Sequence, residues 1–265
     1  MKLEETRVIE HREIQGGYRL LVLLAPVIAP QVRPGQFVHL RVPHLEAAVL
    51  RRPFSVYDAR HDRISILYKD VGHGTGTMKY LHAGEALSLI GPLGHGFPMC
   101  GEGHIPVLVA GGYGMAALYL GARQSPVKGV AFFGGRTSAD ILCVKEFEAL
   151  GWEVRVSTED GSLGSRGMVT EAVDAWLQSD RGDSVPEFFA CGPNGMLKAV
   201  GDRAIAGGWT AWISMDRHMG CGVGACLTCV QKIKTPDGGW VWERCCKEGP
   251  VFECRKVVWE EKPEA

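Results

Sequence analysis

The sequence predicts a multidomain protein of mixed α+β and α/β class. An antiparallel β-barrel is followed by a parallel α/β domain and a small cysteine-rich domain. Strand-like runs with turn signals fill residues 1 to about 98, and strands alternate with helices from about 104 to 207. Five of the nine cysteines then fall between Cys221 and Cys246. Because 265 residues exceed one small core, we divide the chain into residues 1–99, 100–208 and 209–265.

The composition is that of an ordinary globular protein. Charged residues make up 22% of the chain and the net charge is −1, so no global field recruits nucleic acid or an anionic membrane. The apolar runs are too short for a membrane span. The acidic N-terminal residues Met1–Glu5 contain no apolar segment of the kind found in a signal peptide. We therefore expect a cytoplasmic protein with no membrane partner.

The first domain is expected to be a barrel or sandwich of short antiparallel strands. Turn signals such as Pro34-Gly35 and Gly91-Pro92 separate runs rich in Val, Ile, Leu and Tyr. A single helix is expected over 75–81, after a glycine-rich stretch. The strand-like runs are Arg19–Leu24, Gln36–Val42, Arg63–Tyr68 and Ala86–Ile90.

The second domain is expected to consist of parallel βαβ units, because strand-like and helical segments alternate in it. Its strands are predicted over 105–110, 127–133, 153–158 and 187–190, and its helices over 115–123, 146–150, 168–177 and 196–206. The pattern breaks at about Trp209. The tail holds a hairpin signal at Pro236–Gly239 and a last strand-like run, Lys256–Trp259.

The cysteine spacing is the most specific signal in the chain. Cys221, Cys226 and Cys229 form a C-x4-C-x2-C pattern, and either Cys245 or Cys246 follows downstream. This is the plant-type ferredoxin spacing for a [2Fe–2S] cluster, which needs four thiolates. A zinc site and unligated thiols are the alternatives, but zinc sites commonly pair two short C-x2-C knuckles, and only one is present.

Glycines in the cysteine loop fit the same interpretation. Gly222 and Gly224 allow the backbone to adopt positive φ and curl around inorganic sulfides. The loop N–H groups are then available to donate to sulfur, which tunes the potential of a cluster.

Three short segments of the barrel are typical of a site for a phosphorylated ring cofactor. In Arg52-Pro53-Phe54-Ser55, the Arg suits a phosphate and the Ser suits the edge of a flavin ring. Leu67-Tyr68-Lys69 adds an aromatic ring and a positive charge. Gly74-Thr75 opens a helix whose N–H groups suit a pyrophosphate. Taken alone, Arg-Pro is common in edge strands and Tyr68 is an ordinary strand aromatic, so the prediction depends on the combination.

Glycine-rich loops follow three strands of the second domain. Gly111-Gly112-Tyr113-Gly114 lies between a strand and a helix, where a dinucleotide phosphate binds in an open parallel sheet. Gly134-Gly135-Arg136 and Cys191-Gly192-Pro193 follow two further strands. One such loop is also found as a plain tight βα turn, but together they outline a crevice at the carboxyl edge of the sheet.

In this order the motifs resemble those of the ferredoxin–NADP⁺ reductase superfamily. They are R-P-F-S, G-T, G-P-L-G-x-G-F, G-G-x-G, D-G-S-x-G, C-G-P-x-x-M-L and C-G-x-G-A-C-x-x-C. More narrowly, the chain is similar over essentially its whole length to the electron-transfer subunits of class 1B dihydroorotate dehydrogenases. Two departures from the family pattern are Ala110, where a glycine is frequent, and Ala117, where a proline is frequent.

The resemblance implies an FAD-binding barrel, an NAD-binding α/β domain and a C-terminal [2Fe–2S] domain. It implies an FMN-containing dihydroorotate dehydrogenase catalytic subunit as partner, two chains of each type in a heterotetramer, and a role in pyrimidine biosynthesis. NAD(H) is then a substrate whose hydride passes to the flavin, and electrons leave singly through the cluster. No acid–base residue is required, so no catalytic side chain is predicted.

The resemblance also assigns residues. Arg52–Ser55, Leu67–Lys69 and Gly74-Thr75 are expected to hold FAD, and the loops that follow Ala110 and Ala190 to hold the dinucleotide. The family's fourth cluster ligand precedes a Gly-Pro-Val-Phe stretch. Cys246 stands at that place, so the predicted ligands are Cys221, Cys226, Cys229 and Cys246.

Other functions remain compatible with the residues alone. A related ferredoxin or sulfide oxidoreductase subunit shares the motifs and serves another partner. A stand-alone reductase feeds free acceptors, and a zinc-binding interaction module binds no flavin. The preference for NADH or NADPH stays open, because no acidic or basic reader of the ribose stands out in the sequence.

Overall fold

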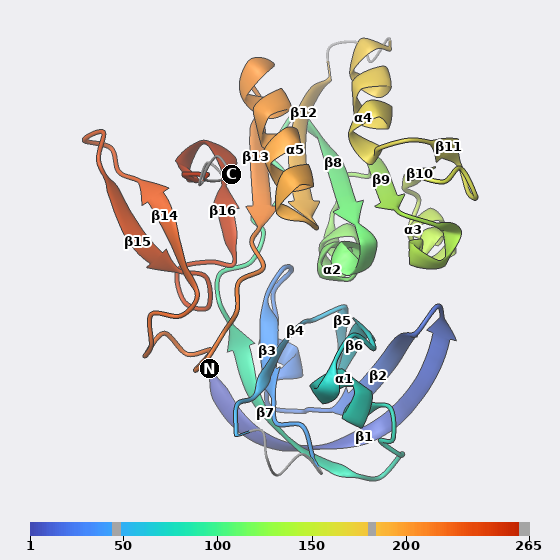
Figure 1. Ribbon diagram of the computed structural model, residues 1–265, viewed down its shortest axis with the longest axis vertical. Coiled ribbons are helices and arrows are strands. Elements are labelled where there is room, and N and C mark those ends of the chain that lie inside the picture. Colours follow the sequence, from blue (N-terminus) through green and yellow to red (C-terminus); the bar gives the residue numbers. More distant parts are fainter. Residues whose placement is uncertain (44–48, 180–183, 260–265) are drawn as a thin grey trace, which may run out of the picture.

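The strands of the described residues form two seven-stranded sheets and a two-stranded hairpin. The computed structural model describes residues 1–43, 49–179 and 184–259. The curled sheet (blue to cyan) lies against one end of the parallel sheet (green to orange), and the hairpin (red) lies beside both (Figure 1). The predicted fold class is confirmed.

The first sheet is antiparallel throughout, in the order β4-β3-β7-β1-β2-β6-β5. It curls into a half-barrel until β4 contacts β6, and the short helix α1 (His73–Met78) follows β6. The strands are β1 (Lys2–Gln15), β2 (Tyr18–Leu24), β3 (Phe37–Leu40), β4 (Arg52–Ser55), β5 (Asp58–Arg60), β6 (Arg63–Lys69) and β7 (Ala86–Leu93).

The second sheet has the order β11-β10-β9-β8-β12-β13-β16, and all its strands are parallel except β16. The strands are β8 (His104–Gly111), β9 (Val130–Gly135), β10 (Glu153–Thr158), β11 (Ser165–Arg166), β12 (Val185–Cys191), β13 (Thr210–Ser214) and β16 (Val251–Glu253). The helices are α2 (Met115–Gln124), α3 (Val144–Ala149), α4 (Val169–Gln178) and α5 (Asn194–Ala206).

Helices cover both faces of this sheet, which explains its unbroken apolar strands. Along β8, Val107 and Val109 belong to the core under α4 and α5, whereas Leu108 and Ala110 belong to the core under α2 and α3. From β8 the chain continues through β9, β10 and β11 on one side of the sheet. It then crosses to the other side of β8, where β12 and β13 lie. The point between β8 and β12 is therefore the topological switch where ligands bind in open parallel sheets.

The helices and strands predicted for the second domain are confirmed to within a few residues. The predicted helix over 75–81 is shifted, because α1 ends at Met78. The Gly91-Pro92 turn signal is wrong, because both residues lie inside β7. The long strand β1 stands outside the runs singled out from the sequence. Its Glu4 and Thr6 alternate inward although they are polar, which hides the apolar period.

The C-terminal segment is tied into the second sheet. Strand β13 pairs with β12, so the parallel sheet continues past the boundary predicted at 208. Strands β14 (Val230–Lys234) and β15 (Trp240–Arg244) form the hairpin expected around the Pro236–Gly239 turn. The strand predicted over 256–259 is wrong. The chain forms a 3-10 turn over Cys254–Lys256, and of the following residues Val257 makes an isolated bridge to Ile233.

Polar and aromatic contacts join the barrel to the second domain. The Arg123 side chain of α2 donates to Asp58 Oδ1 at 2.9 Å and to the Ala59 carbonyl at 2.9 Å. The rings of Tyr57 and Tyr119 stack with their centroids 4.4 Å apart. These groups are mostly buried, so they fix how the two sheets face each other.

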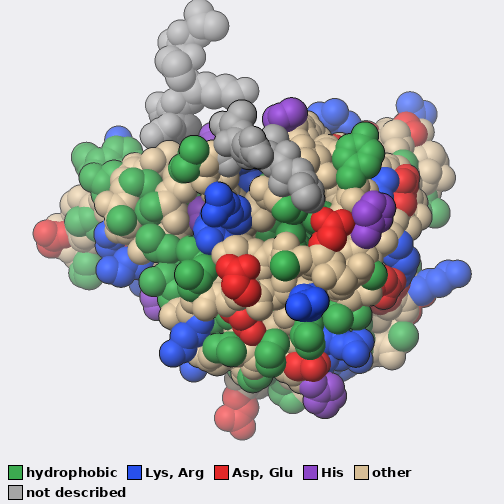
Figure 2. Space-filling view, turned by 90° about the horizontal axis from the view of Figure 1, so that it is seen from below, with side chains coloured by type: hydrophobic (Ala, Val, Ile, Leu, Met, Phe, Trp, Pro, Cys, Tyr) green, Lys and Arg blue, Asp and Glu red, His purple; other side chains and the backbone are tan. Residues whose placement is uncertain are grey.

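Acidic and basic side chains are mixed across the face seen in Figure 2 rather than gathered by sign. This distribution agrees with the net charge of −1. None of the helices within the described ranges has the length and apolar character needed to cross a lipid bilayer.

Replacing Arg123 by Met should lower the free energy of unfolding by about 1–3 kcal/mol, because Asp58 and the Ala59 carbonyl lose a charged donor inside the interface. Urea unfolding measures the change. Arg155→Met is the control, since Arg155 pairs with Glu153 on the surface and the loss should stay below about 1 kcal/mol. Equal losses in the two variants would contradict a structural role for this interdomain contact.

Candidate functional site

A cavity of about 460 Å³ opens where the curled sheet, the parallel sheet and the cysteine-bearing segment meet. All nine residues predicted to hold a flavin line it, although they come from three separate segments of the barrel. Its lining is Phe37, Arg52, Pro53, Phe54, Ser55, Leu67, Tyr68, Lys69, Val71, Gly72, His73, Gly74, Thr75, Tyr113, Ala116, Cys191, Ser214, Met215, Asp216, Met219 and Pro250.

The Arg52 side chain lies beside Gly74 of helix α1. Its guanidinium donates to the Leu50 carbonyl at 2.7 Å. A Cβ added to Gly74 would lie 3.2 Å from Arg52 Nε, so the glycine leaves room for this side chain. Arg52 and Gly74 therefore belong to one binding surface, and its positive charge suits a phosphate group.

The Tyr68 hydroxyl is engaged on the side of the barrel. It lies 2.9 Å from His11 Nε2, while His11 Nδ1 lies 3.0 Å from the Leu81 carbonyl. Burial lowers the pKa of His11. A neutral ring that donates from Nδ1 to a carbonyl accepts at Nε2, so the Tyr68 hydroxyl is the donor to His11. Tyr68 therefore offers its ring rather than its hydroxyl to the cavity.

Lys69 also has a partner in the protein. Its ammonium lies 2.8 Å from Asp140 Oδ1, and the Tyr18 hydroxyl donates to the same oxygen at 3.1 Å. Hydrogen bonding to Lys69 lowers the pKa of Asp140. Because Asp140 belongs to the second domain, the charge expected to face the cofactor forms an interdomain ion pair at the cavity edge.

Thr75 shapes the loop before α1. Its hydroxyl oxygen accepts from the backbone N–H groups of Val71 at 3.0 Å and Gly72 at 3.1 Å. The hydroxyl therefore caps the start of the helix, and Thr75 also lines the cavity.

The two glycine-rich loops predicted for the dinucleotide pack directly on each other. A Cβ on Gly114 would overlap the Cys191 carbonyl, and one on Gly111 would lie 2.7 Å from Pro193 Cδ. Gly112 has φ +55°. The two loops follow β8 and β12 and so meet at the topological switch. Of the predicted residues in these loops, only Cys191 lines the cavity, and the others, Gly111, Gly112, Gly114, Gly192 and Pro193, do not.

Sequence reasoning missed the wall supplied by the end of β13. Ser214, Met215 and Asp216 line the cavity, and burial raises the pKa of the Asp216 carboxyl. The signal that identifies them is positional, because they follow the carboxyl end of a parallel strand next to β12. The sequence analysis ended the sheet at residue 208 and so passed over them.

The cysteine loop has backbone N–H groups directed at sulfur. The N–H groups of Ala225 and Cys226 both donate to Cys221 Sγ at 3.3 Å. A hydrogen bond with the Thr228 hydroxyl lowers the pKa of the Cys226 thiol to about 6. Stabilised thiolates in a loop of donor N–H groups are what an iron–sulfur cluster requires.

The four predicted ligands fall into two pairs. Cys226 lies against Cys221. Burial raises the pKa of Cys246 to about 12, and the neighbouring Cys229 thiol is the next cause. Over residues 1–43, 49–179 and 184–259, no three His, Cys, Asp or Glu side chains are grouped to hold one metal ion. Two thiolates for each of two irons is the donor set of a [2Fe–2S] cluster, so these residues fit it.

Cys245 and Cys246 differ in their surroundings. The Cys245 backbone N–H donates to the Cys229 carbonyl at 2.8 Å, and its side chain is fully buried. Cys246 interacts with the Cys229 and Cys221 thiols, and the Gly224 backbone lowers its pKa. Both side chains are buried and both interact with the Cys229 thiol, but only Cys246 has a side-chain hydrogen bond to it among the causes that raise its pKa.

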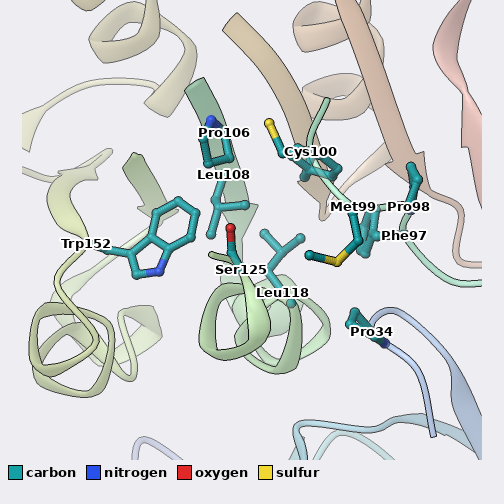
Figure 3. Close-up of a pocket in the computed structure, with 12 residues that line it drawn as sticks. Pro34, Phe97, Pro98, Met99, Cys100, Pro106, Leu108, Leu118, Ser125 and Trp152 are labelled. Atoms are coloured by element: carbon teal, nitrogen blue, oxygen red, sulfur yellow. The ribbon is translucent and has the colours of Figure 1, made fainter. Parts of the chain in front are cut away.

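A second cavity, of about 40 Å³, lies away from this site. Apolar side chains of β8, α2 and the 97–100 loop border it, with Leu118, Met99 and Trp152 converging from different elements (Figure 3). None of the site residues predicted from the sequence lines it. It is a packing gap between elements of the second domain and the start of the barrel's Pro34 loop.

Comparison with known proteins extends the match beyond the local motifs. Residues 216–258 match the family model of the iron–sulfur cluster binding domain of dihydroorotate dehydrogenase B. The dihydroorotate dehydrogenase B (NAD(+)) electron transfer subunit of Geobacillus thermodenitrificans is 36% identical over 262 residues, which cover 96% of this chain and 98% of the relative. The chain belongs to this family of electron transfer subunits. The subunit of Bacillus cereus strain Q1 is 34% identical over 97% of this chain and 99% of its own.

Solved structures show the same architecture. An NADH-dependent reduced ferredoxin–NADP oxidoreductase, described in a study of flavin-based electron bifurcation, superposes with a TM-score of 0.83. It is 27% identical and covers 96% of this chain and 90% of its own. A ferredoxin reductase of carbazole 1,9a-dioxygenase, at 21% identity and a TM-score of 0.66 over 78% of this chain and 66% of its own, shows the shared fold. The predicted family and oxidoreductase class are confirmed.

Replacing Asp216 by Asn should stabilise the protein increasingly as pH rises from 4 to 8. Asp216 is partly exposed, but loss of hydration at the cavity wall raises the carboxyl pKa in the folded state above the ordinary value of 3.8, so the folded protein binds this proton more tightly than the unfolded chain does. The wild type therefore loses stability with rising pH, and the Asn side chain does not. Urea unfolding at several pH values measures the difference. A flat difference for Asp216→Asn would contradict the argument.

Replacing Arg52 by Gln should weaken flavin binding about ten- to hundredfold, the effect of losing one charge-assisted hydrogen bond to a phosphate of about 1.5–3 kcal/mol. Flavin fluorescence on titration of the apoprotein measures the affinity. Arg51→Gln is the matched control, because Arg51 donates to the Ser88 carbonyl and hydroxyl instead of lining the cavity. Equal affinity in the Arg52 and Arg51 variants would remove Arg52 from the binding site.

Proposed function

We propose that this chain carries electrons between NAD(H) and an FMN-containing dihydroorotate dehydrogenase catalytic subunit in pyrimidine biosynthesis. The observation that carries the proposal is the 36% identity to an electron transfer subunit over almost the full length of both chains. The cavity and the paired cysteines supply the local chemistry in the order that such a relay requires.

The proposed occupant of the large cavity is FAD. Support comes from the nine barrel residues predicted for it, which meet on one surface beside the glycine-rich loops. Arg52, with Gly74 beneath it, would bind phosphate, and the Tyr68 ring would pack against the cofactor. The volume of about 460 Å³ is in the range of a small-molecule site. Bound FAD supplies the exchange between two-electron nicotinamide chemistry and one-electron transfer.

The proposed nicotinamide site is the crevice at the meeting of the Gly111–Gly114 and Cys191–Pro193 loops. Glycines there let two backbones approach where a larger residue would collide, and they leave N–H groups open to phosphate. Tyr113, Cys191 and Asp216 close the inner wall. The Tyr113 ring and the Cys191 thiol would offer apolar surface to the reacting ring, and Asp216 would offer a carboxyl group. The similarity to NAD(+) electron transfer subunits supports NAD(H) rather than NADP(H) as the dinucleotide.

The proposed cluster ligands are Cys221, Cys226, Cys229 and Cys246. The short loop holds one pair, and the hairpin β14–β15 brings the distant thiolate back beside Cys229. Met219, two residues before the first ligand, lines the flavin cavity. The cysteine loop is thus continuous with the cavity wall, which supports direct electron transfer between the two centres.

The proposed assembly is a heterotetramer with two chains of each type, and the proposed division of the chain stays 1–99, 100–208 and 209–265 by function. The bifurcating oxidoreductase that shares the fold at a TM-score of 0.83 supports one alternative, a subunit of the same architecture serving another partner. A neighbouring gene for a dihydroorotate dehydrogenase catalytic chain distinguishes the two.

The fourth ligand is tested by two serine variants of adjacent residues. Cys246→Ser should lose most of the cluster absorbance and the EPR signal of the reduced cluster, because one iron lacks a thiolate. Cys245→Ser should keep both, and this neighbouring variant serves as the control. A cluster that survives in the Cys246 variant and disappears in the Cys245 variant would reverse the assignment.

The function is tested by co-expression with the dihydroorotate dehydrogenase catalytic chain. The two chains should co-purify, and the complex should form orotate with reduction of NAD⁺. The isolated catalytic chain, assayed alongside, should not reduce NAD⁺. If anaerobic NADH fails to bleach the absorbance of a preparation that contains both flavin and iron, the nicotinamide assignment is wrong. If bleaching occurs without orotate formation, the partner is wrong.

A further inference from the structure

His39 is a buried histidine with no role in the site described so far. It lies on β3 and has 0% of its surface exposed. Burial lowers the pKa of His39 to about 4, and the Cys221 backbone acts against this shift, yet neither Nδ1 nor Nε2 meets hydrogen-bond geometry with any described residue. Buried ring nitrogens are normally satisfied by protein or bound groups, and an orphaned pair is destabilising. Its surroundings must therefore explain why this side chain is tolerated.

The His39 ring faces the cysteine loop. A Cβ placed on Gly222 would overlap His39 Nδ1, so the ring packs on the backbone of the residue that follows Cys221. Gly222 is buried and has φ +68°. A larger residue is excluded there both by the backbone conformation and by the imidazole itself.

Other contacts of β3 support this position of the His39 ring. Phe37, two residues before His39, belongs to the same hydrophobic core as Cys229 and Cys246. On its backbone, His39 is paired with Pro53 of the Arg52–Ser55 strand. His39 therefore stands between a strand that lines the flavin cavity and the loop that carries the first three cysteines.

We propose that His39 is a positioning residue of the iron–sulfur centre, whose ring N–H donates a hydrogen bond to the sulfur shell of the cluster held by the Cys221–Cys229 loop. The inference rests on the proposed ligand set. A neutral imidazole has one N–H to donate, and the loop N–H groups of Ala225 and Cys226 already show that this loop directs donors at sulfur. The cluster would then satisfy a donor that the protein leaves unpaired.

A donor to sulfur stabilises the more negative, reduced cluster and so raises its potential. Removing it should shift the cluster potential to more negative values and leave the flavin potential in place. If His39 only filled space, a phenylalanine ring of similar size would replace it and the cluster potential would stay the same.

The first test uses wild-type holoprotein labelled with ¹⁵N in histidine alone. Pulsed EPR of the dithionite-reduced cluster should detect coupling to a histidine nitrogen and to an exchangeable hydrogen after transfer to D₂O. His39→Gln should remove the histidine coupling, whereas coupling to exchangeable hydrogens should persist in both proteins because the N–H groups of Ala225 and Cys226 also donate to sulfur. A reduced wild-type cluster without histidine coupling overturns the inference and needs no variant to do so.

The second test is an EPR-monitored redox titration of the holoprotein. His39→Phe should shift the cluster midpoint to a more negative potential, and His39→Gln should shift it less. His82→Phe, at an exposed histidine of the barrel, should leave it unchanged. A cluster present in His39→Phe at the wild-type potential overturns the inference.

The two proposals fail in different ways. A wild-type protein with no [2Fe–2S] signal after reduction contradicts the proposed function and the ligand set. A wild-type protein with that signal, whose histidine nitrogens are uncoupled, contradicts the role of His39 alone.

Discussion

The site depends on one short strand that two binding surfaces share. Strand β3 pairs with the Arg52–Ser55 strand on one side and with β7 on the other. Outside the barrel core, Phe37 packs in the hydrophobic cluster that holds Cys229 and Cys246, and His39 packs on Gly222. Because strands in a sheet are held about 4.8 Å apart by their hydrogen bonds, this ladder fixes the separation between the flavin cavity and the paired thiolates. Electron transfer over such a gap requires a constant distance more than it requires a reactive side chain.

A set of contacts between the two large sheets keeps the cavity in shape. Lys69 and Tyr18 reach Asp140, and Asp58 reaches Arg123. The partners in these contacts come from different domains and are mostly buried or half-buried. Charged pairs of that kind contribute through geometry as much as through energy, because removing one member leaves the other without compensation. Lys69, which the sequence suggested as a positive charge for the cofactor, helps to hold the two domains together through Asp140.

Local patterns predicted the parts of the site that depend on local backbone conformation. The glycine loops after β8 and β12 and the C-x4-C-x2-C loop each need positive φ or a close backbone approach, so the requirement is visible in a few adjacent residues. The lining residues Arg52–Ser55 were predicted differently, from the chemistry of their side chains and from the family resemblance. These predictions needed no knowledge of how distant segments meet.

The remaining features arise from contacts between distant residues and leave no local pattern. Lys69 and Asp140 are 71 residues apart in the chain, and the His39 ring meets a glycine in another domain. The final strand was wrong because an apolar run follows a 3-10 turn that the sequence does not mark. The boundary at 208 preceded β13 because strand pairing, rather than the change in composition at Trp209, decides where the sheet ends.

Strand β13 and its short antiparallel neighbour β16 also determine which fragments of the chain can exist on their own. A piece that stops at residue 208 would expose the backbone of β12 along a long apolar edge, and such edges recruit other chains. A piece that begins at residue 209 would contain β13 and β16 but lack β12, the strand with which β13 pairs. The chain is therefore expected to fold as one unit, although its three cofactor-binding regions look like separate domains in the sequence.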